Sequence, residues 1–155
     1  MARALDVLDR RLLALLQRNN LATADELADQ VGRSSSAVAR RLRRLREEGA
    51  VAADVAVVSD AAAGCPLSAL VHVQLERHAP QESLELRRRW LASPHVQLCL
   101  DIAGAFDVVL MVVAADMETY NAFASTLLEH PAVRRFETSF VKKRHKATLA
   151  FPIEV

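Results

Sequence analysis

Apolar residues recur with a helical period at the start of the chain. The leucines stand three or four positions apart, at Leu5, Leu8, Leu12, Leu15 and Leu16. This spacing predicts an amphipathic helix that ends near Asn19. The same pattern places the charged residues Asp6, Asp9, Arg10 and Arg11 on its solvent side.

Two more helices are predicted directly downstream. Thr23 is a good N-cap, and Glu26 stands three residues later, as in a capping box. This second helix buries Leu27, Ala28 and Val31 and ends at Gly32. For the third helix we expect Ser34 to accept hydrogen bonds from the free amides of the first turn. Its apolar stripe is Val38, Leu42 and Leu45, and Gly49 ends it. Three short helices with a tight turn before the last predict a helix-turn-helix unit.

The remainder alternates between strand and helix patterns. Residues 50–59 are predicted as a short wing or linking strand, and Gly64 and Pro66 mark a boundary. Period-two alternation then predicts strands over 69–76, 96–102 and 136–140, and an apolar run predicts a buried strand over 108–113. One helix opens at Pro80, with Leu84, Trp90 and Leu91 as its apolar residues, and another follows Asp116.

The order β-α-β-β-α-β is the ferredoxin-like arrangement. The fold class is therefore α+β, with a helix-turn-helix domain over 1–50, a linking strand or hinge over 51–66 and a ferredoxin-like domain over 67–155. Two helices on one face of the sheet leave the other face bare, and we expect a second subunit to cover it.

The third helix has the chemistry of a DNA-reading helix. Six arginines and no acid lie between Gln30 and Arg46. Small polar residues at the start of such a helix can reach base edges, while arginines contact guanine or phosphate. The candidate DNA-binding residues are Arg33, Ser34, Ser35, Ser36, Arg40, Arg41, Arg43 and Arg44. The alternative is a solvated surface helix. Arg41 lies nearer the buried stripe, where it could equally pair with an acid inside the domain.

Net charge, the positions of cysteine and histidine, and the lengths of apolar runs limit the functions that the sequence can support. The formal net charge is only +1, so the basic character is local to the third helix. The two cysteines and five histidines show no metal-ligand spacing, and we expect no metal, no cofactor and no catalytic residues. Charged residues interrupt any leader-like apolar run and no stretch suits a membrane span, which predicts a cytoplasmic protein with no membrane partner.

Short motifs along the whole chain resemble the Lrp/AsnC family of transcription regulators. The matching stretches are Leu5–Asp9, Glu26–Gly32, Val38–Leu45, Glu47–Gly49, Gly104–Asp107, Val133–Thr138 and the tail Lys146–Ile153. Arg33, Ser35 and Leu149 depart from the family pattern.

The resemblance implies a regulator that binds double-stranded DNA and a small-molecule effector. The effector would be an amino acid or a similar compound, held by Gly104, Ala105, Phe106 and Asp107, with Thr138 and Ser139 lining the same pocket. The alternative for this loop is a tight turn in which Asp107 is structural. The resemblance further implies a homodimer that stacks into an octamer.

Two other functions fit the same architecture. The siroheme decarboxylases of haem biosynthesis resemble it in domain organisation, although the chain shows no clustered histidine pair. A ligand-sensing scaffold that no longer binds DNA is the second, and the intact arginine face argues against it.

Overall fold

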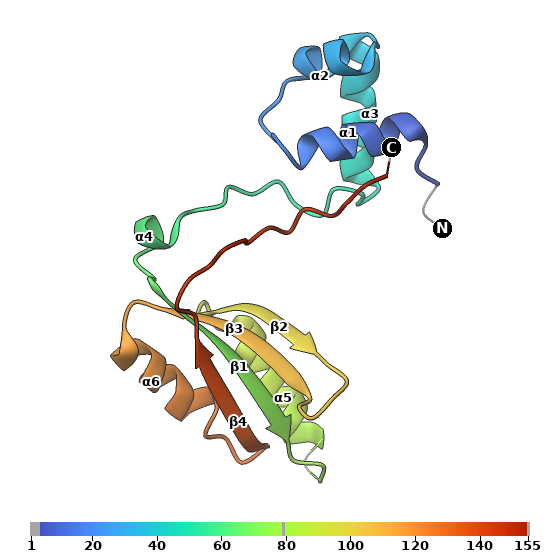
Figure 1. Ribbon diagram of the computed structural model, residues 1–155. Coiled ribbons are helices and arrows are strands. Elements are labelled where there is room, and N and C mark those ends of the chain that lie inside the picture. The colour runs from blue at the N-terminus through green and yellow to red at the C-terminus, as the bar shows by residue number, and fades with distance from the viewer. Residues whose placement is uncertain (1–3, 79, 155) are drawn as a thin grey trace. The chain divides into compact units, whose positions relative to one another are not determined.

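The protein, represented by a computed structural model, is described over residues 4–78 and 80–154 (Figure 1). Residues 1–3, 79 and 155 lie outside the description. Contacts divide the chain into a helical unit, up to Ala56 and again from Lys146 onward, and a sheet unit, Val57–His145. The end of the chain therefore groups with the helices, unlike the expected boundary, which assigned all of 67–155 to the sheet domain.

The helical unit contains the three predicted helices, α1 (Val7–Leu16), α2 (Ala24–Val31) and α3 (Ser35–Glu47). Capping boxes start α1 and α2, formed by Asp6 with Asp9 and by Thr23 with Glu26. Gly32 ends α2 in a left-handed conformation at φ 64°, which favours glycine because it has no Cβ. The core comprises Leu12, Leu13, Leu16, Leu27, Ala28, Val31, Val38, Leu42 and Leu45.

Two local expectations for this region were wrong. Ser34 is the N-cap residue of α3, but its side chain makes no capping hydrogen bond. Its Oγ instead lies 3.4 Å from Oγ of Ser36. Residues 50–59 form no strand, because no described strand lies alongside to supply the ladder hydrogen bonds that a strand requires. The short helix α4 (Asp60–Ala63) follows them.

A buried ion cluster joins α1 to α3. Asp9, expected on the solvent side, is only 1% exposed. Its carboxylate accepts from Nη1 of Arg41 at 2.7 Å and from Nη2 of Arg44 at 2.7 and 2.8 Å. Arg41 Nη1 also donates to Asp6 at 2.6 Å. Arg41 and Arg44 are three positions apart and therefore lie on the same face of α3, so one buried carboxylate binds both.

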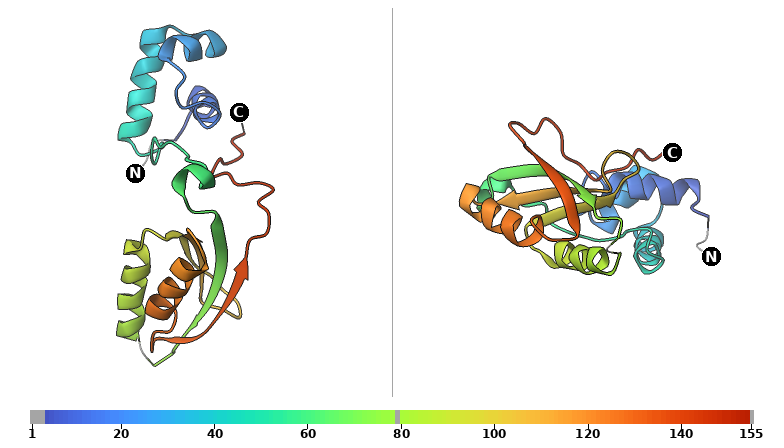
Figure 2. Two further views of the ribbon diagram at one scale, coloured as in Figure 1. Left: turned by 90° about the vertical axis from the view of Figure 1, so that its left-hand side faces the viewer. Right: turned by 90° about the horizontal axis from the view of Figure 1, so that it is seen from below.

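The sheet unit is the predicted ferredoxin-like fold. Its strands are β1 (Leu67–Leu75), β2 (Val96–Asp101), β3 (Val108–Ala114) and β4 (Val133–Phe140). All pair antiparallel, in the order β2-β3-β1-β4. The helices α5 (Pro80–Ala92) and α6 (Met117–Leu127) cover one face of this sheet (Figure 2).

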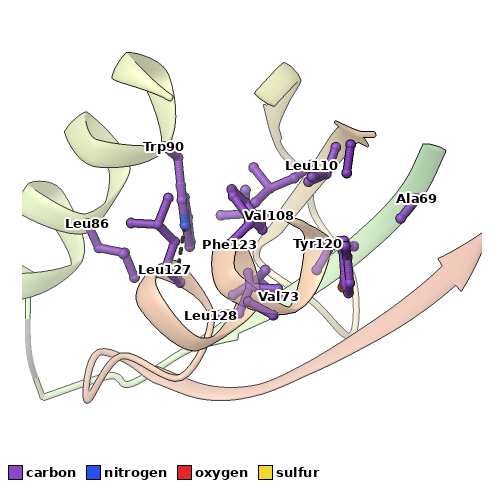
Figure 3. Packing of buried hydrophobic residues seen from close by; sticks show 14 of the residues in the cluster. Ala69, Val73, Leu86, Trp90, Val108, Leu110, Tyr120, Phe123, Leu127 and Leu128 are labelled. Atoms are coloured by element: carbon purple, nitrogen blue, oxygen red, sulfur yellow. Dashed lines mark hydrogen bonds between the residues drawn. The ribbon is translucent and has the colours of Figure 1, made fainter. Parts of the chain in front are cut away.

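The core of the sheet unit lies between that face and the two helices (Figure 3). Trp90 is fully buried, and its Nε1 donates to the carbonyl of Leu127 at 3.0 Å. The expected apolar residues of α5 were only partly right, because Leu84 and Leu91 are 52% and 67% exposed. Leu86 is buried instead, one helical turn before Trp90 and on the same face.

The opposite face of the sheet carries apolar side chains that no described element of the sheet unit covers. Leu98 and Leu100 pair with Met111 and Val109, and directly paired residues point to the same face. Leu98 and Leu100 are 39% and 46% exposed. We name Leu98, Leu100, Val109 and Met111 the bare face. Among the described residues, no helix is long and apolar enough to cross a membrane.

Replacing Asp9 tests the ion cluster. Asp9→Ala removes the buried carboxylate that Arg41 and Arg44 share, which leaves Arg41 only Asp6 and Arg44 only the more distant Glu48 among the described residues, and should destabilise the helical unit by about 2–3 kcal/mol. Hydrogen exchange of the α1 and α3 amides would report the loss. Asp29→Ala, an exposed acid in the same unit, is the matched control and should change stability by less than about 0.5 kcal/mol. Equal effects of both variants would contradict the cluster's role.

Acid should loosen the same contact. The hydrogen bond from Arg41, with a smaller part from the Asp9 amide, holds the pKa of the Asp6 carboxyl below its usual value. A depressed pKa contributes stability above the unfolded value of about 4, and that contribution is lost as pH falls through the folded value. Asp6→Asn keeps an N-cap but removes the charge. The helical unit of this variant should lose less stability below about pH 4 than that of the parent protein. If the free energy of unfolding falls equally with pH in both proteins, the prediction is wrong.

Candidate nucleic-acid interface and effector site

Helix α3 presents three groups of side chains. Val38, Leu42 and Leu45 point into the helical core. Arg41 and Arg44 are directed to Asp9 of α1. A third group, Ser36, Arg40 and Arg43, is exposed and has the spacing i, i+4, i+7 that aligns residues on one side of a helix. We name this third group the outer face of α3.

The guanidinium groups of Arg40 and Arg43 are free for a ligand. Both residues are exposed, and neither forms a hydrogen bond or ion pair within the described part of the chain. No acidic residue lies in the first turn of α3, where the helix dipole places partial positive charge. The outer face therefore suits phosphate oxygens and guanine acceptors.

Arg41 and Arg44 occupy a different environment from Arg40 and Arg43. Arg41 adopts the intramolecular pairing that the sequence left open, and Arg44, predicted only as a DNA-binding residue, joins it. The reason is electrostatic, because a buried carboxylate is costly unless cations and hydrogen bonds compensate its charge. Both side chains remain about one-quarter exposed, at 28% and 26%.

The other candidates lie around the start of α3. Arg33 is exposed and donates to the carbonyl of Gly32 at 3.0 Å. Ser35 is the first residue of the helix, and Ser34 and Ser36 are both exposed. Arg46, which the sequence did not single out for DNA, pairs with Asp54 at 2.7 Å. The start of α3 thus presents small polar side chains next to the arginines of the outer face.

The candidate effector loop, Gly104–Asp107, connects β2 to β3, and Asp107 anchors it to β1. The Asp107 amide donates to the carbonyl of Val73 at 2.9 Å. Its carboxylate Oδ2 accepts from the amide of Leu75 at 2.8 Å. The structural role considered for Asp107 is thus present, while its Oδ1 bonds to no described residue. Gly104 faces open space, since a Cβ there would contact nothing within 4 Å.

Phe106 projects from this loop onto the bare side of the sheet. The centroid of the Phe106 ring lies 5.5 Å from the centroid of the His72 ring. The guanidinium carbon of Arg135 lies 4.9 Å from the same Phe106 centroid. The sequence could not identify His72 and Arg135 as neighbours of Phe106. Their proximity depends on the β1–β4 register, in which Gln74 pairs with Arg135 and His72 with Glu137.

Thr138 and Ser139 do not both face this loop. Consecutive strand residues point to opposite faces of a sheet. Thr138 lies on the helix-covered face, hydrogen-bonded to the hydroxyl of Tyr120, and Ser139 lies opposite, paired with Leu70. An open hollow of about 510 Å³ elsewhere in the sheet unit is lined by Leu67, Met117 and Phe140, among others, and not by the loop.

Models of known families match both units. The Lrp/AsnC ligand-binding domain matches residues 68–151, and a winged helix-turn-helix DNA-binding model matches residues 5–52. The HTH-type transcriptional regulator y4tD of Sinorhizobium fredii is 39% identical over 99% of this chain and 92% of its own. The DNA-binding transcriptional activator DecR of Escherichia coli is 30% identical over 97% of this chain and 99% of its own.

Solved structures of similar proteins match nearly the whole chain. The transcriptional regulator NMB0573 of Neisseria meningitidis, crystallised with L-methionine, has a TM-score of 0.87 and 30% identity, covering 96% of this chain and 97% of its own. An AsnC family regulator from Agrobacterium tumefaciens reaches 0.88 at 24% identity over 96% of this chain and 97% of its own, which supports the fold. Both units, in this order, thus have counterparts in one group of regulators, and the chain belongs to the Lrp/AsnC family of DNA-binding transcriptional regulators.

Proposed function

We propose that this regulator reads specific DNA sequences by placing α3 in the major groove. The observation that carries the proposal is the outer face, where Arg40 and Arg43 are exposed and unpaired within the described residues. Ser35 and Ser36 would approach base edges at the start of the helix, with Arg33 and Ser34 close to the phosphates. Arg41 and Arg44, bound to Asp9, would orient the helix and add positive charge to its flank.

A homodimer supplies the second recognition helix. One helix reads few base pairs, so a two-fold dimer that reads two half-sites increases specificity. The bare face supports dimerisation through the sheet unit, because Leu98 and Leu100 are exposed and an apolar sheet face is buried in stable assemblies. Stacking of such dimers into an octamer belongs to the same proposal.

The proposed effector is an amino acid bound at the Gly104–Asp107 loop. Loop amides can hold a carboxylate, and Oδ1 of Asp107 can accept from an ammonium group. The open space beside Gly104 supports an approach from that side. The Neisseria regulator complexed with L-methionine supports this ligand class. Effector binding would change the placement of the dimers and so the spacing of the α3 helices on DNA, a coupling between two sites.

The decarboxylase alternative has no specific observation in its favour. The relatives described above are named as transcriptional regulators, which supports a regulator over an enzyme.

Replacing the outer-face arginines tests DNA reading. With a site selected from random DNA by the parent protein, Arg40→Ala with Arg43→Ala should weaken binding. If both residues contact phosphates, the slope of log affinity against log salt should fall by about two. Arg88→Ala, an exposed arginine of the sheet unit, is the control and should leave that slope unchanged. Unchanged affinity in the double variant would reject the outer face as the contact surface.

Thermal shift tests the effector loop. L-methionine at about 100 times its dissociation constant should stabilise the protein by about 2.7 kcal/mol, a shift of several degrees. Gly104→Val places a branched side chain in the open space, where its Cβ meets nothing within 4 Å, and should abolish the shift. Asp107→Asn retains an acceptor for the Leu75 amide while removing the charge, and should weaken the response. An undiminished shift in both variants would place the ligand elsewhere.

A further inference from the structure

The last residues of the chain form part of the helical unit. This segment contains the motif that resembles the family tail, and neither DNA contact nor effector binding explains it. We name residues 147–153 the strap. Gln17, the C-cap residue of α1, binds the strap twice. Its Nε2 donates to the carbonyl of Phe151 at 3.0 Å, and its Oε1 accepts from the Phe151 amide at 2.7 Å.

One apolar side chain anchors the strap as well. Ile153 is partly buried and packs against the helical core. Leu149 and Phe151, by contrast, are 90% and 78% exposed, so their side chains contribute little to the attachment. The amide of Ala150 donates to Oγ1 of Thr148 at 3.0 Å, which shapes the strap before the Gln17 contact. The attachment therefore combines main-chain recognition by Gln17 with burial of Ile153.

The chain just before the strap is fixed within the sheet unit. The amide of Val141 donates to the carbonyl of Ser68 at 2.9 Å. Arg144 pairs with Asp60 at 3.0 Å and donates to Oγ of Ser68 at 3.1 Å. Only His145 and Lys146 separate Arg144 from the strap.

Gln17, which binds the strap, is also connected to α3 through α1. Gln17 ends α1, and α1 carries Asp9, the carboxylate that binds Arg41 and Arg44 of α3. The strap, α1, the ion cluster and α3 therefore form an unbroken series of contacts within the helical unit. We therefore expect an ordered end of α1 to hold Asp9, and through it α3, in position.

We propose that docking of the strap on Gln17 and the helical core completes the DNA-binding unit and is required for its full affinity. Gln17 and Ile153 are positioning residues, because neither belongs to the outer face of α3. The affinity part of this inference rests on the proposed DNA contacts. The structural part does not, because it concerns the order of α1 alone.

Hydrogen exchange and DNA binding of the full chain test the strap. Gln17→Ala and Ile153→Ser should each speed exchange in the strap and in the last turn of α1. Each should also lower DNA affinity about fivefold, the order of change expected when a pair of exposed hydrogen bonds or one partly buried apolar side chain is lost. The salt slope should stay that of the parent, because no phosphate contact is removed.

Phe151→Ala is the matched control, since Gln17 binds only the main chain at that position. It should match the parent protein in both measurements. Exchange and affinity in Gln17→Ala that equal those of Phe151→Ala would overturn the inference. A parent chain that selects no DNA would reject the proposed DNA contacts, whereas the exchange of α1 would still decide whether the strap orders it.

Discussion

The carboxylate of Asp9 is almost fully buried and bound by two arginines of the neighbouring helix. A buried charge of this kind tolerates little displacement, because any separation from its partners exposes the full cost of desolvation. Apolar contacts between α1 and α3 could accommodate some sliding or rotation. The ion cluster, by contrast, fixes the rotation of α3 relative to α1. It thereby divides the arginines of α3 into those that hold the helix in place and those that remain available to a ligand.

This division reconciles the nearly neutral charge of the chain with the DNA-reading role that we propose for α3. Asp6 and Asp9 compensate part of the charge of Arg41 and Arg44, and Asp54 pairs with Arg46. Arg40 and Arg43 keep their full charge on the exposed side. A small number of unpaired arginines favours sequence-specific contacts. A helix with every arginine unpaired would bind any phosphate backbone strongly and discriminate less among DNA sequences.

Much of the fold could be predicted because periodicity reports local burial. The three helices, the strands and the ferredoxin-like order all follow from apolar spacing and caps. Contacts between distant segments could not be predicted in this way. Asp9 occupies a polar position in the α1 pattern, and only the packing of α3 against it shows that it is buried. Phe106 likewise meets Arg135 through strand register, and no spacing along the chain encodes that.

The discontinuous helical unit has a practical consequence for anyone who recombines this protein. A cut near Ala56 separates the three helices from the segment that begins at Lys146, although the contacts group both together. A chimaera that joins these helices to a foreign sensor at one junction would therefore lack Ile153 and the main chain that Gln17 binds. A graft at two junctions, with the foreign sensor inserted between Ala56 and Lys146, preserves all parts of the helical unit.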